Sequence, residues 1–365
     1  MRPRGAGPEC GRLLTVFALV CVLGSEWRAR GADEPAPPAP LRTATELFVA
    51  FAPAIVRVNI ITDDLDETGK PARLPFTGFF ISNEGRVLTS LGDSTRVSRV
   101  WIEKDGLDYA AQYLGGDVRT HLALIQALRM PETFAVIPID GSRPLPPIGS
   151  PVVALSQPLE VDVSPSPGWV TGSESGFAQF VFPCSYLRTN IPLGPGDGGA
   201  PVLDGGGHLA GVMVSGVPAL RASYLVTPHS LKRIVGDLAE HGKVIYGTLP
   251  VEFAEGPDSL YVARQVVVSR VTPESSADRA GIRPGDVLKR LGDTPIRRIA
   301  DVRDVLFNAR PGEFLRIELE REGRAIPFFT LPVEAQREDV IPAEKPPAPE
   351  PAKTIVPDFN QGKRG

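Results

Sequence analysis

The sequence is poor in cysteine, with three among its 365 residues. Cys10 and Cys21 lie in an N-terminal segment typical of a secretion signal, so the mature chain is expected to keep only Cys184. A single cysteine excludes an intrachain disulfide, and packing must therefore stabilise the fold. A lone cysteine is more often a small buried apolar residue than a nucleophile, and we expect this of Cys184.

The sequence also lacks an excess of charge of either sign. Its formal net charge of -4 gives no electrostatic basis for binding nucleic acid. It has only four histidines, and neither these nor the cysteines show a metal-ligand spacing such as HxxxH or CxxC. We therefore expect no metal, no cofactor and no nucleic-acid partner.

The apolar run at Leu13–Leu23 is short for a transmembrane helix. Arginines precede this run and small residues follow it, which is the pattern of a signal peptide. We predict a signal peptide over residues 1–31 and export to the periplasm or cell envelope. An uncleaved membrane anchor is the alternative.

Glycine and proline, in contrast, are abundant, with 37 and 38 residues. Proline-rich segments predict a linker over residues 32–42 and a disordered tail over residues 336–365, because such compositions bury too little apolar surface to become ordered. Between these ends, glycine and proline separate short apolar runs. This pattern is typical of turns between β-strands.

Short runs with β-strand character occur between residues 55 and 215, and none alternates with a helix. Asn83-Glu84-Gly85 and Lys104-Asp105-Gly106 are typical hairpin turns between such runs. Many short strands without interleaved helices predict a β-barrel or a β-sandwich. The runs are Ile55–Ile60, Phe76–Ile81, Arg86–Ser90, Arg99–Glu103, Tyr109–Leu114, Leu122–Leu128, Val152–Ser156 and Leu209–Ser215.

Helical signals are confined to a few places. Thr43 and Glu46 form a capping box before a short apolar helix. Thr227 can cap a second helix, which has proline at its first position and Gly242 at its end. The apolar face of this second helix consists of Leu231, Ile234, Val235 and Leu238.

A further domain follows this connector helix. It has strand-like runs at Val266–Val271 and Leu315–Glu320 and a short helix that ends at Gly281. Another helix is indicated by apolar residues at helical spacing. They are Val302, Val305, Leu306 and Ala309.

Several longer stretches carry a family resemblance. TGFFISNEGRVLTS and GGDVRTHLALIQAL are similar to the segments that hold the histidine and the aspartate of trypsin-like proteases. LRTNIPLGPGDGGAPVLDGGGHLAGV is similar to the segment that holds the serine, and PESSADRAGIRPGDVLKRLGDTPI resembles the core of a bacterial PDZ domain. With the connector TPHSLKRIVGDLAEHGKVIYG, the chain resembles the HtrA/Deg family over residues 43–333.

The resemblance implies a mainly β fold, in which a trypsin-like double Greek-key β-barrel precedes an α+β PDZ domain. On this basis the protease-fold domain covers residues 43–226 and the connector helix residues 227–245. The PDZ domain covers residues 246–335.

The resemblance also places the catalytic triad on three residues that cannot supply its chemistry. The histidine falls on Gly92, the aspartate on His121 and the serine on Gly198. Glycine can neither accept a proton nor attack a carbonyl, and an imidazole cannot replace the carboxylate that orients the base. Loss of the triad leaves at most about 10³–10⁴-fold acceleration from the oxyanion hole and binding.

The oxyanion hole consists of backbone and can outlast the triad. Backbone N–H groups of Gly196 and Gly198 are its candidate donors, although Asp197 between them could compete for these donors or repel an anion. The alternative is that this glycine-rich turn has only a structural role.

A relocated hydrolase site is the weaker alternative. Ser90, Ser94 and Ser215 lie in segments near the expected cleft. The remaining histidines are explained by the fold without a catalytic role. His208 belongs to a hairpin turn, and His229 and His241 belong to the connector helix.

The PDZ segment also departs from its family. The loop that binds a peptide carboxylate corresponds to residues 247–251, where Pro250 replaces a glycine and removes one N–H donor. The candidate groove walls could equally be core of the domain. They are Leu249, Val251 and Phe253 on the strand side, and Val302 and Leu306 on the helix side.

We therefore predict an exported HtrA-like pseudoprotease that acts as a peptide-binding, protein-binding or assembly module in the cell envelope. One alternative is a diverged serine endopeptidase of envelope protein quality control with a non-standard active site, and another is a purely structural envelope protein. The expected partners are a protein or peptide C-terminus at the PDZ domain and an active HtrA relative, in a homo- or heterotrimer. Leu47, Phe48 and Phe51 are candidates for that contact or for packing against their own barrel.

Overall fold

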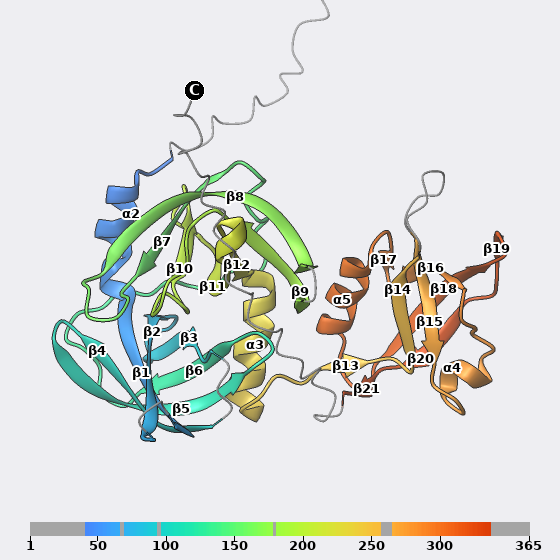
Figure 1. Ribbon diagram of the computed structural model, residues 1–365, viewed down its shortest axis with the longest axis horizontal. Coiled ribbons are helices and arrows are strands. Elements are labelled where there is room, and N and C mark those ends of the chain that lie inside the picture. Colours follow the sequence, from blue (N-terminus) through green and yellow to red (C-terminus); the bar gives the residue numbers. More distant parts are fainter. Residues whose placement is uncertain (1–40, 66–68, 93–95, 178–179, 257–264, 337–365) are drawn as a thin grey trace, which may run out of the picture. The chain divides into compact units, whose positions relative to one another are not determined.

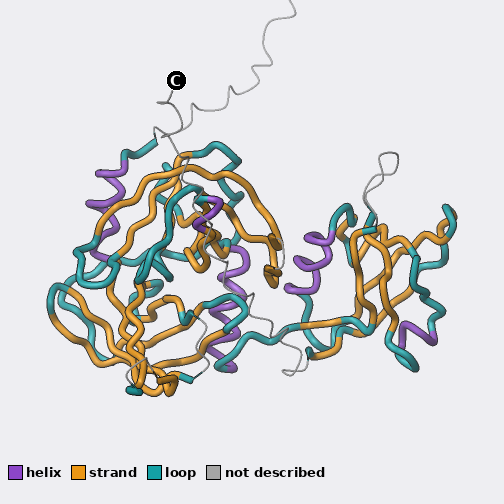
Figure 2. Tube along the Cα trace, in the orientation of Figure 1, coloured by secondary structure: helices purple, strands orange, loops and turns teal. Residues whose placement is uncertain are grey.

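The computed structural model describes residues 41–65, 69–92, 96–177, 180–256 and 265–336, and strands dominate it (Figure 1; Figure 2). The predicted signal peptide, nearly all of the linker and nearly all of the tail lie outside these residues. In the described ranges, no helix combines the length and apolar character that crossing a bilayer requires.

Two closed barrels of six strands form the first part of the fold. The strand order of the first is β1-β2-β3-β6-β5-β4, and the second, starting from β7, has the equivalent order β7-β8-β9-β12-β11-β10. The predicted double barrel is therefore confirmed. The strands are β1 (Ile55–Leu65), β2 (Pro71–Phe80), β3 (Arg86–Ser90), β4 (Val97–Lys104), β5 (Leu107–Asp117), β6 (Leu122–Ala127), β7 (Pro151–Ser156), β8 (Ser164–Phe177), β9 (Phe180–Thr189), β10 (Pro201–Asp204), β11 (Leu209–Val217) and β12 (Ala222–Val226).

The strands alternate in the way that a barrel requires. Val56, Val58 and Ile60 of β1 are fully buried in the core of the first barrel. Since successive side chains of a strand point to opposite faces, the intervening residues of β1 point away from this core. The tight β4–β5 hairpin has positive φ at Asp105 and Gly106, 52° and 75°, as a two-residue turn of this kind requires.

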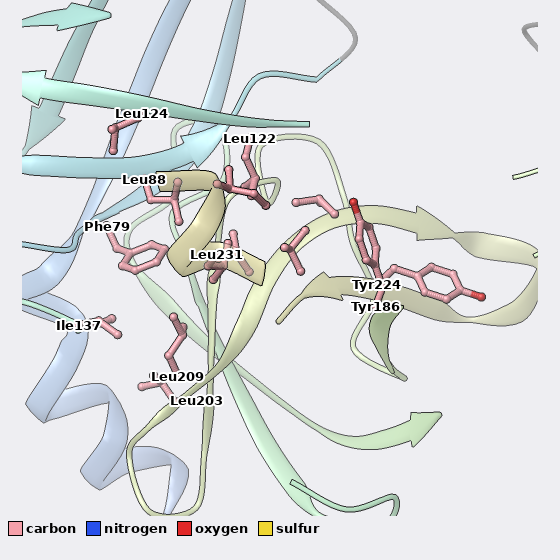
Figure 3. Packing of buried hydrophobic residues seen from close by; sticks show 14 of the residues in the cluster. Phe79, Leu88, Leu122, Leu124, Ile137, Tyr186, Leu203, Leu209, Tyr224 and Leu231 are labelled. Carbon is pink, nitrogen blue, oxygen red and sulfur yellow. The ribbon is translucent and has the colours of Figure 1, made fainter. Parts of the chain in front are cut away.

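A larger apolar cluster joins the two barrels (Figure 3). The first barrel contributes Phe79 of β2 and Leu88 of β3, and the second contributes Leu203 of β10 and Leu209 of β11. Leu231 of the connector helix lies in the same cluster. The barrels therefore share this apolar cluster, and each barrel also has a separate cluster of its own.

Cys184 belongs to this cluster and is 1% exposed. Burial raises the pKa of its thiol to about 12. The thiolate, which is the reactive form, is therefore scarce at neutral pH. The expectation of a buried apolar cysteine is confirmed.

Helix α2 (Ala44–Phe51) precedes the first barrel, and a 3₁₀ turn, η1 (Ala52–Ala54), follows it. The capping box of Thr43 and Glu46 is present as predicted. Leu47 is buried in the shared core, and Phe48 and Phe51 pack against the same cluster. All three side chains contact the protein's own apolar cluster, and their role in a trimer contact stays a prediction.

Helix α3 (Pro228–His241) follows the second barrel, which also contains the turn η2 (Pro218–Leu220). Thr227 occupies the N-cap position, but its side chain makes no capping hydrogen bond. The helix ends at Gly242, whose φ of 72° is left-handed. Leu231, Ile234 and Leu238 are buried, whereas Val235 is only partly buried.

The C-terminal part has its own apolar core and the predicted PDZ fold. Its main sheet has the strand order β14-β15-β16-β18-β19, so β14 forms one edge. β17 pairs with β16, β20 pairs with β18, and β13 pairs with β21 in a separate sheet. The elements are β13 (Gly247–Thr248), β14 (Val251–Glu255), β15 (Val266–Val271), α4 (Ser276–Arg279), β16 (Val287–Leu291), β17 (Thr294–Pro295), α5 (Ile299–Asn308), β18 (Phe314–Arg321), β19 (Arg324–Ala325), β20 (Phe329–Pro332) and β21 (Glu334–Ala335).

Candidate functional site

The glycine turn between β9 and β10 is closed by its own aspartate. The backbone N–H of Gly194 donates to Oδ2 of Asp197 at 2.8 Å, and the backbone N–H of Asp197 donates to the carbonyl of Gly194 at 3.2 Å. The Asp197 carboxylate is thus occupied within the turn. It does not compete for the N–H groups of the two glycines beside it.

Both barrels hold this turn in place. From β2, Thr77 donates its backbone N–H to the carbonyl of Gly198 at 3.0 Å and its hydroxyl to the carbonyl of Gly196 at 2.8 Å. From the second barrel, Met213 of β11 accepts the N–H of Gly199 at 2.7 Å. The turn is therefore held by hydrogen bonds to both barrels.

The structure brings the three predicted triad positions together, with the ring of Phe76 beside the two glycines. A Cβ atom added to Gly92 would lie 3.2 Å from Cζ of Phe76, and one added to Gly198 would lie 3.4 Å from its Cδ1. His121 lies beside them, with its Nδ1 2.9 Å from the carbonyl oxygen of Gly92. An aromatic ring thus fills space next to both glycines.

His121 takes part in backbone interactions. Because a carbonyl oxygen only accepts, its Nδ1 carries the proton that is donated to Gly92. The φ of His121 is 57°, and its own carbonyl accepts from the N–H of Leu91 at 2.8 Å. The imidazole therefore helps to fix the loop that carries Gly92.

Ser90 lies beside the glycine turn. Its Oγ would lie 3.2 Å from a Cβ on Gly198. The hydroxyl donates to the carbonyl of His121 at 2.9 Å and accepts the N–H of Gly92 at 3.3 Å. Both of these partners are backbone groups, so no base activates this hydroxyl in the described contacts.

Among the described residues, the other candidates for a relocated site have different partners. The hydroxyl of Ser90 is hydrogen-bonded to backbone groups. His208 lies 3.3 Å from Oδ1 of Asp204 in the β10–β11 turn, and His229 and His241 are exposed on α3. Ser94 lies outside the described residues.

The two candidate oxyanion donors are available in the turn. Within the described ranges, no hydrogen bond uses the backbone N–H of Gly196 or Gly198. Gly196 has a φ of 89°, a conformation that glycine adopts without strain. The turn can therefore present backbone donors to a carbonyl oxygen, although it supplies no nucleophile.

The loop before β14 is tightly packed into the PDZ core. Leu249, Pro250 and Val251 are buried, and the carbonyl of Pro250 accepts the N–H of Thr272 at 3.0 Å. Proline supplies no N–H, so the loop has one donor fewer for a bound carboxylate. Because β14 is an edge strand, its free side could still take an added peptide strand.

The five candidate groove residues differ in exposure. Leu249, Val251 and Val302 are buried in the PDZ core, whereas Phe253 and Leu306 pack against that core and are only partly buried. The structure brings all five into one cluster. Only Phe253 and Leu306 keep surface that a ligand could contact, and the groove role of the set stays a prediction.

Helix α5 also uses residues outside that cluster for polar contacts. Asp304 accepts the backbone N–H and the hydroxyl of Ser185 of β9, both at 2.6 Å, and Arg303 donates to the carbonyl of Ser175 of β8. Phe307 belongs to the shared barrel core. The same helix thus carries candidate groove residues and contacts with the second barrel.

Phe76 and Thr77 are the site residues that sequence analysis missed. The run Phe76–Ile81 was predicted as a strand, but its pattern does not show that Phe76 lies beside the glycine turn. In the described ranges, no group of three or more His, Cys, Asp or Glu side chains could hold a metal ion.

Comparisons with known proteins agree with this architecture. Residues 76–212 match the trypsin-like peptidase domain, and residues 267–321 match the PDZ domain. The putative serine protease HhoA of Synechocystis is 26% identical, with 87% of this chain and 94% of that protein covered. The periplasmic pH-dependent serine endoprotease DegQ of Escherichia coli is 23% identical, with 79% and 70% covered.

The solved structures show the same fold. The HtrA-type protease AlgW with a tripeptide has a TM-score of 0.66 at 19% identity, with 81% of this chain and 98% of that chain covered. The periplasmic serine endoprotease DegP of Salmonella typhimurium is 27% identical, and the matched region is 53% of that longer protein.

Proposed function

We propose that this chain, which belongs to the HtrA/Deg family of trypsin-like serine proteases with a PDZ domain, is a pseudoprotease that binds polypeptides without cleaving them. The main support is that Gly92 and Gly198 lie beside the ring of Phe76 and that His121 is hydrogen-bonded to the carbonyl of Gly92. These positions supply no nucleophile and no orienting carboxylate. Peptide hydrolysis by this family's chemistry needs both, together with a free base.

The trypsin-like cleft is proposed to act as a peptide clamp. Within the described ranges the N–H groups of Gly196 and Gly198 form no hydrogen bond, and the Asp197 carboxylate accepts from Gly194. Two convergent backbone donors can hold a peptide carbonyl whether or not a nucleophile is present. Binding would therefore persist after the loss of catalysis.

The PDZ domain is proposed as the second recognition element. The edge strand β14 and helix α5 border the partly exposed Phe253 and Leu306, which can take the apolar last residues of a partner protein. The HtrA-type protease AlgW has been solved with peptides, which supports peptide recognition by this architecture. Pro250 weakens the carboxylate loop, so we expect the side chains of the peptide to contribute more than its terminal carboxylate.

The proposed place of action is the cell envelope. DegQ and DegP, which this chain resembles, are named as periplasmic endoproteases. The apolar run at Leu13–Leu23 supports export of this chain as well. An active HtrA relative, in a mixed or homogeneous trimer, is the proposed assembly partner.

The PDZ part of the proposal is tested with the Leu306→Asp variant. We expect saturable binding of an apolar C-terminal peptide to the unmodified chain, and at least about a tenfold loss of affinity in the variant, because a carboxylate would enter the apolar surface. Asn308→Asp is the matched control, since it places the same charge on an exposed position of α5. Fluorescence anisotropy measures the affinity.

Mass spectrometry of the same samples should show that the peptide stays intact. A cleaved peptide would contradict the pseudoprotease proposal. Equal binding by the unmodified chain and Leu306→Asp, with unchanged melting temperatures, would show that the PDZ groove does not bind the peptide. Absence of saturable binding would favour a purely structural envelope protein.

A further inference from the structure

A second candidate site lies on the outer face of the first barrel. A pocket of about 850 Å³ is bordered by strands β1, β2 and β4 and by the segment after β7. This volume is within the range of about 300–1,000 Å³ that small-ligand pockets occupy. The lining residues that matter here are Arg57, Asn59, Arg73, Glu103 and Leu159.

Two polar residues of β1 are buried at this pocket. Their neighbours Val56, Val58 and Ile60 fill the barrel core, so Arg57 and Asn59 point to the outer face. Outer-face residues are usually solvated, yet Arg57 is only 7% exposed and Asn59 is 0% exposed. Burial of such groups is costly unless they have hydrogen-bond partners.

Each of these two side chains has one buried donor atom without a hydrogen-bond partner in the described residues. Arg57 forms an ion pair with Glu103 and donates to the carbonyl of Val161 at 3.1 Å. Asn59 accepts from Nε and Nη2 of Arg73 at 3.2 and 2.9 Å. In the described part of the chain, Nε of Arg57 and Nδ2 of Asn59 have no partner. Both of these atoms are donors, so the missing partner is an acceptor.

The charges at the pocket add a second preference. Glu103 neutralises Arg57, whereas Arg73 has no ion pair in the described residues and stacks on the ring of Trp101, 5.2 Å from its centroid. Glu160 also borders the pocket and is exposed, as Arg73 is, so solvent screens both of these charges. Arg73 is the lining cation that forms no ion pair within the described residues.

We infer that this pocket binds a carboxylate, held by the amide of Asn59 and the guanidinium of Arg73. A guanidinium can bind both oxygens of a carboxylate, and a buried amide N–H can share one of them. Apolar atoms next to the carboxylate would contact Pro75, Leu159 and Val161. This chemistry is met by a glutamate or aspartate side chain of a polypeptide and by a small dicarboxylate.

The pocket adjoins the glycine turn without sharing its predicted triad positions. Leu159 has a φ of 49°, which is strained for a leucine, and its backbone N would lie 2.8 Å from a Cβ on Gly196. Leu159 thus contacts both the pocket and the turn. A polypeptide in the cleft could therefore place an acidic residue in the pocket.

The test uses two decapeptides with amidated C-termini, which are identical except that one position is glutamate in the first and glutamine in the second. Succinate serves as the small dicarboxylate. Amidated ends remove the PDZ carboxylate contact from the measurement. We expect the glutamate peptide to bind the purified full-length chain about tenfold more tightly than the glutamine peptide, as a charge-assisted hydrogen bond predicts. Arg73→Gln should abolish this difference.

Arg99→Gln is the matched control. Arg99 stacks on Trp101 as Arg73 does, 5.5 Å from the ring centroid, but it does not line this pocket. The control should keep the preference for glutamate, and Asn59→Leu should reduce it. Competition by succinate would identify a small dicarboxylate as a ligand, and preference without competition would identify an acidic peptide.

Three results would overturn the inference. They are equal affinity of the two peptides together with no succinate binding, an Arg73→Gln variant that keeps the preference, and an Arg99→Gln variant that loses it to the same extent as Arg73→Gln. Melting temperatures of all variants show whether each one is folded, and exposed Arg73 is not required for the barrel core.

Discussion

Replacing Gly199 with alanine is expected to lower the free energy of unfolding by about 4 kcal/mol or more, which is exceptional for a single methyl group. An added Cβ would lie 2.1 Å from the carbonyl oxygen of Thr77 and 2.6 Å from the backbone N of Ser90. These are backbone atoms of β2 and β3 and cannot rotate away. The φ of Gly199 is 90°, which adds strain for any residue with a Cβ.

The matched control is Gly198→Ala, one residue earlier. Its added Cβ would meet Cβ and Oγ of Ser90 at 3.2 Å and Cδ1 of Phe76 at 3.4 Å, and side chains of this kind can shift by a few tenths of an ångström. We expect a change within about 1 kcal/mol. Chemical denaturation of both variants measures the difference.

This comparison separates the frame of the turn from its lost function. If Gly199→Ala is costly and Gly198→Ala is not, the backbone can still hold a side chain at the predicted nucleophile position. Equal costs at the two positions would show that Gly198 is also required by the fold. In that case the absence of serine would be a structural necessity.

Rebuilding a catalytic triad is expected to require a fourth substitution, at Phe76. A variant with Gly92→His, His121→Asp and Gly198→Ser should react with a fluorophosphonate no faster than the unmodified chain. A Cβ on Gly92 would lie 3.2 Å from Cζ of Phe76, so the ring obstructs the new imidazole. The φ of 63° at Gly92 lies in the left-handed region, which histidine adopts more readily than most residues, so the ring is the main obstacle.

Addition of Phe76→Gly should give measurable labelling at position 198. A triad that acts as a unit contributes about 10⁶-fold in kcat, so even partial assembly is detectable. Gly198→Ser alone is the control and should stay unlabelled, because a hydroxyl without a base is a weak nucleophile. Equal labelling of the triple and quadruple variants would show that Phe76 is not an obstacle.

An unlabelled but folded quadruple variant would contradict the assignment in another way. It would mean that Gly92, His121 and Gly198 do not occupy the geometry of the three catalytic side chains. Circular dichroism and melting temperatures of each variant establish that it is folded.

The barrels were predictable from local alternation, but not all of their strands were. Short apolar runs identified β1, β3 and β6. β8 was missed, because Ser164–Phe177 is rich in proline, serine and glycine and has low intrinsic strand propensity. Pairing with β7 and β9 on its two sides imposes the strand there. The contact depends on residues distant in sequence, which a local pattern cannot contain.

In the candidate site, too, some features were predictable from the sequence and others depend on contacts between distant residues. Motif register placed Gly92 and Gly198 in one cleft, and the structure finds both beside the same ring. The position of the Phe76 ring could not be predicted in this way, because it depends on how β2 packs against the glycine turn. The burial of Arg57 and Asn59, with donors that lack acceptors, was also not predictable from the sequence, because strand alternation predicts that these β1 residues are solvated.

The most direct test of the pseudoprotease proposal is labelling of the purified, unmodified chain with a fluorophosphonate, followed by intact-mass analysis. An active family relative such as DegP, labelled under the same conditions, confirms that the reagent works. We predict no added mass on this chain, because Ser90 is bonded to backbone groups and position 198 has no side chain. A stoichiometric adduct on any serine would contradict the proposal and identify a nucleophile outside the Gly92, His121 and Gly198 positions.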